Sequence, residues 1–214
     1  ERFGVVPANS IYGTSICPDE INNEKGDLAN RMLEHWGSCF PMGGIGGAPY
    51  VGKQGFDCFS HHVPENGNLV ILFGPHVAVS EDGQLGKYKR AGQKEHSPAC
   101  RAVLNTYKLA SAGANCCSED LDMQQAWIHR KITEKLDEID LAEYPIAAVI
   151  RLAYEAAKEK LLAIVNHDFG SGQLVLLGGI QVNLPEPFED HFQPLLFQLS
   201  AADGSCHNVL SELF

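Results

Sequence analysis

The sequence predicts a single α/β domain in which a mainly parallel central sheet is flanked by helices. Apolar runs typical of strands alternate with stretches whose apolar residues recur every three or four positions, as in helices. The chain has 214 residues and 44% hydrophobic content, which is enough for one sizeable core. No tandem repeat, heptad pattern or low-complexity tract divides it. We therefore expect residues 1–214 to form one domain.

The elements predicted for the first half are a strand at 9–16, a helix at 25–36, a loop at 40–56, a strand at 55–61 and a strand at 68–73. The helix is indicated by Leu28, Met32 and Trp36, which share one face. Six glycines in the loop indicate a backbone that passes close to another group. The run NLVILF at 68–73 is apolar throughout, so we expect a central strand that is buried on both faces.

The second half is expected to begin with a helix at 98–112, for which Ser97 and Pro98 would supply the N-cap and the first position. The remaining predicted elements are helices over 118–165 with breaks near 141–145, strands at 173–183 and 191–201, and a short amphipathic helix at 207–214. Alternating strands and helices indicate parallel strands, and functional sites in such sheets lie beyond the carboxyl ends of the strands.

Composition excludes several classes of protein. A net charge of −11 and a pI of about 5.2 argue against a nucleic-acid partner, because phosphate binding requires a basic face. No apolar run approaches the roughly 18 residues that a membrane-spanning helix needs. Seven cysteines are too few for a disulfide scaffold of this length, so reduced thiols are expected. The chain starts at Glu1 without a methionine, which indicates a fragment whose targeting segment, if any, lies outside it.

Three candidate metal ligands follow predicted strand ends or begin a predicted helix. Cys17 ends the first strand, His76 follows the buried strand, and Cys100 lies in the first turn of the next helix, where free N–H groups favour a thiolate. Two thiolates and one imidazole form a tetrahedral zinc site with one position left for water, as in catalytic zinc sites. Each cysteine could instead be a small buried core residue. Another alternative makes Cys17 a nucleophile, with His76 or His61 as base and Asp19 as the orienting group.

The motifs CPDE, GGIGGAPYVGKQGF, FSHHVPENG and LFGPHVAV resemble the limiting-CO2-inducible B/C family, algal proteins described as θ-class carbonic anhydrases with a β-class-like fold. The resemblance extends over about residues 5–115 and implies zinc ligands at Cys17, His76 and Cys100. The chain also looks like the β-class pattern CxDxR, with two departures. Ile21 stands where the β class has arginine, and the second cysteine lies far beyond the histidine.

The resemblance implies reversible hydration of CO2 to bicarbonate by zinc-bound hydroxide. Zinc lowers the pKa of a bound water far below its usual value, toward about 7. Asp19 would accept a hydrogen bond from that water and orient it toward the carbon of CO2. Because Ile21 cannot serve as the cation that keeps Asp19 ionised, we expect Arg31 to do so, with Arg90 as the alternative.

The glycine-rich loop lacks the GK[ST] ending of a phosphate-binding loop, so we expect it to form one wall of a small substrate pocket, with Gly44 and Phe56 in that wall. Either His61 or His62 would transfer protons to buffer, because histidine titrates near neutral pH. Tyr88 is a weaker candidate for a residue beside the zinc.

The resemblance also implies a homodimer, a chloroplast location and a role in concentrating CO2. An alternative function within the same family is a catalytically silent component of a CO2-concentrating assembly that binds zinc or bicarbonate. The nucleophile alternative is a Cys-dependent hydrolase that needs no metal.

Overall fold

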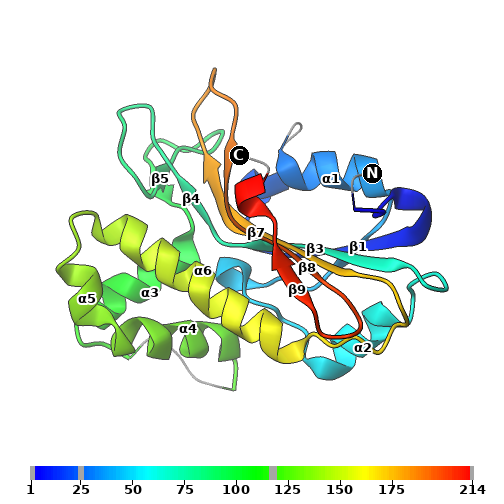
Figure 1. The fold of residues 1–214 in the computed structure, drawn as a ribbon. Helices are drawn as coiled ribbons and strands as arrows, with labels where there is room; N and C mark the ends of the chain where they lie inside the picture. Colours follow the sequence, from blue (N-terminus) through cyan, green and yellow to red (C-terminus); the bar gives the residue numbers. More distant parts are fainter. Residues whose placement is uncertain (1–2, 24–26, 116–119, 213–214) are drawn as a thin grey trace.

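The computed structural model describes residues 3–23, 27–115 and 120–212, and its centre is a mixed seven-stranded sheet (Figure 1). The strands are β1 (Ser10–Ile16), β2 (Cys39–Pro41), β3 (Asn68–Gly74), β4 (His76–Ala78), β7 (Leu174–Asn183), β8 (His191–Ser200) and β9 (Cys206–Asn208). Their order is β2-β1-β3-β7-β8-β9, and β4 also pairs with β7. The first five strands of that list pair in parallel, whereas β8 and β9 are antiparallel additions. The predicted mainly parallel α/β fold is confirmed.

Helices cover both faces of the sheet (Figure 1). One face carries α1 (Leu28–Trp36), and the other carries α2 (Lys53–Ser60), α3 (Arg101–Ser111), α4 (Met123–Glu134), α5 (Leu136–Asp140) and α6 (Pro145–Ile164). Side chains alternate along β3, so that Val70 and Leu72 belong to the α1 side while Ile71 and Phe73 belong to the α6 side. Burial on both faces explains why the sequence of β3 is apolar throughout.

The central strand is interrupted where the candidate site begins. β3 ends at Gly74, and after Pro75 the chain resumes as β4 beside the same neighbour, β7, which has a register shift between Gly178 and Gly179. A Cβ atom at position 74 would lie 1.8 Å from the carbonyl oxygen of Gly179, and the φ angle there is 142°, so only glycine fits. Gly74 pairs with Ile16, the last residue of β1. This register brings the residues after both strands to the same edge of the sheet.

The structure corrects the predicted strand at 55–61. These residues belong to the helix α2, whose buried Phe56 and Phe59 are three positions apart, while Cys58 between them is exposed. Three-residue spacing places the two rings on one face of a helix. The turn after α2 leads to the start of β3, where the N–H of Gly67 bonds to Pro64, so this segment reaches the amino ends of β1 and β3.

Two other predicted boundaries also change. Helix α3 begins at Arg101 with Cys100 as its N-cap, whereas Ser97 and Pro98 form the short strand β6 (Ser97–Pro98), which pairs with β5 (Lys87–Tyr88). An extended conformation before and at proline is the common one. The predicted C-terminal helix is replaced by β9 and a 3-10 turn, η4 (Leu210–Glu212), and its last two residues, 213–214, lie outside the described residues.

The loop predicted at 40–56 contains part of strand β2 and the first residues of α2. The other predicted strands and helices have counterparts, although residues 25–26 and 118–119, predicted to begin two helices, lie outside the described residues. Strands were expected near β1, β3, β7 and β8, and helices near α1 and over α4 to α6, with the break before α6 at the expected place. Within the part of the chain that the structure describes, no helix combines the length and the apolar character needed to cross a membrane.

Candidate metal centre

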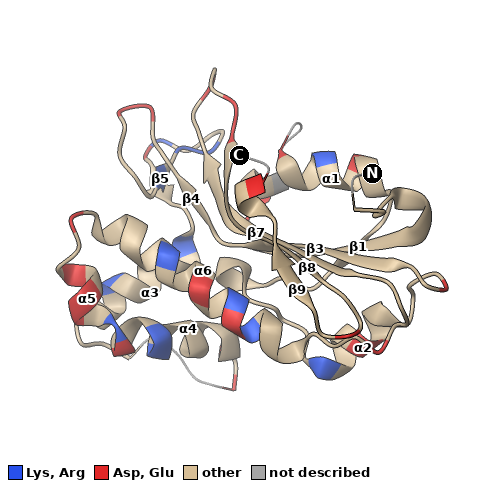
Figure 2. Ribbon diagram, in the orientation of Figure 1, with Lys and Arg blue, Asp and Glu red and all other residues tan. Residues whose placement is uncertain are grey.

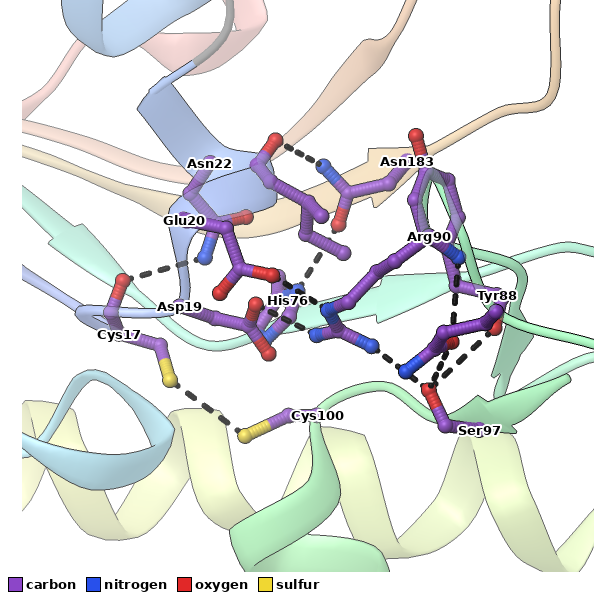
Figure 3. A network of polar contacts seen from close by, with 12 residues as sticks. Cys17, Asp19, Glu20, Asn22, His76, Tyr88, Arg90, Ser97, Cys100 and Asn183 are labelled. Atoms are coloured by element: carbon purple, nitrogen blue, oxygen red, sulfur yellow. Dashed lines mark hydrogen bonds and ion pairs between the residues drawn. The ribbon is translucent and has the colours of Figure 1, made fainter.

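Three predicted ligands come together at the carboxyl edge of the parallel strands (Figure 3). Cys17 follows β1, His76 opens β4, and Cys100 caps the start of α3. One ligand atom from each lies within 4.8 Å of the other two. The two sulfur atoms are 3.4 Å apart, and all three side chains are buried, with at most 4% of each residue exposed. The fold therefore forms a compact Cys-His-Cys cluster from segments distant in sequence.

Asn183, the last residue of β7, fixes the orientation of His76. The side-chain nitrogen of Asn183 donates to the carbonyl of Ile21 at 3.1 Å and to the carboxylate of Asp190 at 2.7 Å. Its Oδ1 is therefore the atom that faces Nδ1 of His76, at 2.8 Å, and it accepts a hydrogen bond from that nitrogen. This arrangement leaves Nε2 of His76 with its lone pair directed away from Asn183.

The donor atoms of the cluster fit a metal ion. Nε2 of His76 is buried and has no hydrogen-bond partner among the described residues, an arrangement that is unfavourable unless another group binds there. Ligating histidines usually donate their second N–H to an oxygen acceptor, as His76 does to Asn183. Thiolate and imidazole donors suit zinc and similar soft or borderline metals. Cys17, His76 and Cys100 could therefore bind a metal.

The two thiols differ in their acidity. The hydrogen bond from Cys17, together with the backbone N–H groups of Val103 and Gly46, lowers the pKa of Cys100 below its ordinary value despite burial. The same hydrogen bond to Cys100, together with burial, raises the pKa of Cys17 well above its usual range. The shared hydrogen bond thus opposes the effect of burial on the pKa at Cys100 and adds to it at Cys17.

Asp19 lies between the cluster and a cation (Figure 3). Its Oδ2 is 3.5 Å from Nε2 of His76, and its Oδ1 accepts a hydrogen bond of 2.7 Å from Nη2 of Arg90. The same guanidinium donates through Nε to Glu20 and through Nη1 to Ser97 at 2.8 Å. These hydrogen bonds fix the Asp19 carboxylate beside the three candidate ligands.

The structure corrects the expectation that Arg31 pairs with Asp19. Arg31, on α1, has a side chain that is 63% exposed, and it lies 4.0 Å from Glu189. Arg90, the alternative, reaches Asp19 because β5 and β6 fold the loop before α3 back over the site and Ser97 of β6 holds the guanidinium. Ile21 is only 2% exposed and packs with Ala78 and Ala99.

The structure places some of the other predicted site residues near the cluster and others away from it. Tyr88 lies beside Arg90, with 6.0 Å between the guanidinium carbon and the ring centre. Gly44 precedes the glycine turn near the cluster, and Phe56 is fully buried in the core on α2. His61 and His62 are exposed residues that follow α2, in the segment that leads to the amino ends of the strands. That edge of the sheet is opposite to the cluster, so the structure does not bring either histidine together with the three candidate ligands.

A cavity of about 1100 Å³ opens beside the network. Glu20, Tyr88 and Arg90 line it on the side of the cluster, and residues 184–190 of the β7–β8 hairpin line another side. Figure 2 shows Lys and Arg on the loop at β5 and Asp and Glu on this hairpin. None of the three candidate ligands lines the cavity, whereas Arg90 and Glu20 do. The Asp19–Arg90–Glu20 network therefore borders both the cavity and the buried cluster.

Sequence reasoning missed Asn183, Glu20 and Ser97. Asn183 could have been found, because it ends a predicted buried strand at the same edge of the sheet as Cys17 and His76. No sequence signal distinguishes Glu20 and Ser97 from other polar loop residues.

The fold and the cluster define an α/β protein with a candidate Cys-His-Cys metal site at the ends of parallel strands. Residues 1–201 match the family described as limiting CO2-inducible proteins B/C beta carbonic anhydrases. This chain belongs to that family. A search of curated proteins found no match.

Two solved structures of family relatives are similar to this chain. The crystal structure of PtLCIB4, a homologue of the limiting CO2-inducible protein LCIB, has a TM-score of 0.87 and 27% identity, and the alignment covers 97% of this chain and 87% of the other. The crystal structure of LCIB has a TM-score of 0.68 and 18% identity, with coverage of 97% and 86%, and shows the shared fold.

Proposed function

We propose that this protein catalyses the reversible hydration of CO2 to bicarbonate with a zinc ion held by Cys17, His76 and Cys100. The observation that carries the proposal is the convergence of these three buried side chains within 4.8 Å, beside a carboxylate that is itself held by an arginine. Membership of a family named for beta carbonic anhydrases supports the same reaction.

The donor set suits a catalytic zinc ion, because three protein ligands leave one coordination position for solvent or substrate. When bound, zinc supplies a Lewis acid that lowers the pKa of a coordinated water toward neutral pH. The contribution of the protein is to hold the three ligands in a dry environment and to place Asp19 where water and CO2 meet.

Asp19 would orient the attacking water. Its Oδ1 is engaged by Arg90, whereas its Oδ2 lies toward the cluster and would accept a hydrogen bond from the water. Accepting that bond turns a lone pair of the water toward the carbon of CO2. Arg90 stays charged at all relevant pH values, so its hydrogen bond holds one oxygen of the Asp19 carboxylate in place. Protons released by the reaction would leave through the cavity that Arg90 lines.

One observation favours a second function. Oδ2 of Asp19 lies 3.5 Å from Nε2 of His76, so its carboxylate would become a fourth ligand if it moved away from Arg90 and toward the two sulfur atoms. A carboxylate in that position would exclude water, and the protein would then be a zinc-binding component without hydration activity. The hydrolase alternative is less favoured, because the hydrogen bond to Cys100 and burial raise the pKa of its nucleophile, Cys17.

The test is metal analysis and stopped-flow CO2 hydration on the same purified sample. We expect about one zinc per chain and rapid hydration, and we expect both to be lost in Cys17→Ala and His76→Ala. Zinc without hydration would support the silent alternative. A metal-free protein with alkylation-sensitive hydrolase activity would support the nucleophile alternative and overturn the proposal.

A homodimer, a chloroplast location and a role in concentrating CO2 complete the proposal, by resemblance to the family. Sedimentation at micromolar concentration tests the first, and a monomer would contradict it. Localisation of the tagged full-length protein in its own cell tests the second.

A further inference from the structure

The glycine-rich segment forms a turn, η3 (Ile45–Gly47), that touches all three segments carrying the candidate ligands. Ser15, two residues before Cys17, donates to the carbonyl of Gly47 at 3.0 Å. A Cβ atom at Gly47 would lie 2.1 Å from the carbonyl oxygen of Gly74, which is two residues before His76. A Cβ atom at Gly46 would lie 2.8 Å from the side chain of Val103, on the first turn of α3.

This turn lies beside the start of α3, which carries the candidate ligand Cys100. Gly46 and Gly47 have φ angles of 62° and 76°, a left-handed conformation that glycine adopts without strain. In this conformation Gly46 packs against Val103, three residues after Cys100, and the N–H of Gly46 contributes to the lowered pKa of Cys100. Hydrogen bonds from N–H groups to a thiolate stabilise its charge and fix its direction.

Gln124, on α4, holds both sides of the turn. Its Oε1 accepts a hydrogen bond of 3.2 Å from the N–H of Ile45, and its Nε2 donates to the carbonyl of Ala48 at 3.4 Å. The turn also closes on itself, because the N–H of Gly44 bonds to Ala48 at 2.8 Å. Since Gly44 has no side chain, Gln124 can approach the backbone; a Cβ atom there would lie 2.1 Å from Oε1 of Gln124.

We propose that Gln124 is a positioning residue for the metal site: it holds the glycine turn against α3 and the two strand ends and thereby keeps the segments that carry Cys17, His76 and Cys100 in place. The inference rests on the proposed metal site and assigns the glycine-rich segment a role in supporting a ligand, rather than only in forming a pocket wall. Gln124 acts through the turn, since its two bonds go to backbone atoms of Ile45 and Ala48.

The expected effect is on metal binding. Removing a partner that orients a metal ligand typically lowers metal affinity by about 10- to 100-fold, and we expect Gln124→Ala to fall near the lower end because its action on Cys100 is indirect. Zinc affinity is measured by competition with a chelator. The cobalt-substituted protein gives a second measurement, because the energy and intensity of its thiolate-to-cobalt absorption depend on hydrogen bonding to sulfur.

Gln125→Ala is the matched control. Gln125 is the next residue on α4 and also donates to a backbone carbonyl, that of Ala102, but it faces α3 rather than the glycine turn. We expect this variant to keep wild-type zinc affinity and an unchanged cobalt spectrum. Gln124→Glu keeps an acceptor for the N–H of Ile45, so it should restore much of the affinity and of the spectrum even if Gln124→Ala lowers thermal stability.

The outcomes separate this inference from the proposed function. Wild-type affinity and spectrum in Gln124→Ala would overturn the inference and leave the proposed zinc site intact. Equal losses in Gln124→Ala and Gln125→Ala would also overturn it, because they would indicate general disruption of α4. A zinc-loaded wild type that hydrates no CO2 would reject catalysis, yet the affinity difference between the variants would still support the role of Gln124. A wild type that binds no metal would reject both.

Discussion

Nη2 of Arg90 donates to Oδ1 of Asp19 over 2.7 Å, although the two residues are 71 positions apart in the sequence. In the β-class pattern CxDxR the arginine follows the aspartate by two residues. This chain has Ile21 at that position. Ile21 is buried against Ala78 and Ala99, so it anchors the loop that carries Asp19. The positive charge beside Asp19 comes instead from Arg90, in the loop between β4 and α3. The guanidinium of Arg90 also donates to Glu20.

The first prediction concerns this cation. Arg90→Ala should lower CO2 hydration by about 10- to 100-fold, because Asp19 would lose the hydrogen bond that holds it beside the cluster. Zinc content should stay unchanged, since Arg90 contacts none of the three ligands in the structure. Arg31→Ala is the control: that side chain is 63% exposed, and activity should be retained. A larger loss of CO2 hydration in Arg31→Ala than in Arg90→Ala would indicate that Arg31, not Arg90, is the cation that acts on Asp19.

Asp19→Asn separates the two proposed functions. If Asp19 orients water, the amide would place a donor where an acceptor is needed, and turnover should fall by about 100-fold or more with zinc retained. If Asp19 instead closes the metal site as a fourth ligand, the same substitution should increase hydration. Stopped-flow measurements beside metal analysis distinguish these outcomes.

A third prediction concerns the partner of His76. Asn183→Ala should lower zinc affinity by about 10- to 100-fold, because Nδ1 of His76 would lose the acceptor that selects its tautomer. It should also destabilise the fold by about 1–3 kcal/mol, since the carbonyl of buried Ile21 and the partly buried carboxylate of Asp190 would lose a donor.

Gln181→Ala is the control for that variant, because Gln181 also donates to Asp190, at 3.3 Å, but does not bond to His76. Chelator competition and denaturant unfolding measure the two effects. Zinc affinity in Asn183→Ala equal to that in Gln181→Ala would show that the orientation of His76 does not depend on the amide.

The convergence of the three candidate ligands could be predicted from the sequence more readily than the residues around them. Cys17 and His76 could be placed together because the hydrophobic runs of β1 and β3 are readable and parallel strands end at a common edge. Arg90 could not be chosen with the same certainty, because its loop has no periodicity and its position depends on the pairing of β5 with β6. A contact of this kind is set by tertiary structure rather than by local propensity.

The expected positions of His61 and His62 depended on the strand predicted at 55–61, which the structure shows to be a helix. A strand at 55–61 would have brought them to a carboxyl strand end, near Cys17. As the residues that follow helix α2 they instead lie in the connection to the first residue of β3. Over so short a stretch, the apolar residues Phe56, Cys58 and Phe59 fit either the two-residue period of a strand or the period of a helix. In the structure both phenylalanine rings are buried on one face, as in a helix.

A final prediction concerns stability at alkaline pH. Tyr154, on α6, is only 1% exposed and stacks on Phe73 of the central strand, with ring centres 5.7 Å apart. Its hydroxyl has no hydrogen-bond partner among the described residues. Burial, reinforced by the neighbouring Glu155, raises the pKa of Tyr154 to about 12. An unfolded tyrosine ionises near pH 10, so between about pH 10 and 12 the unfolded state binds fewer protons and the free energy of unfolding must fall as pH rises.

Tyr154→Phe should therefore leave the free energy of unfolding nearly unchanged at about pH 8, because the stacked ring is kept and no hydrogen bond is lost. Above about pH 10 its stability should decline less steeply than that of the wild type. Some decline should remain, because burial also raises the pKa of Tyr12. Tyr50→Phe, at a residue that is 73% exposed, should follow the wild-type curve. Parallel curves for Tyr154→Phe and the wild type, measured by denaturant unfolding across this range, would show that Tyr154 ionises as readily in the folded protein as in the unfolded chain.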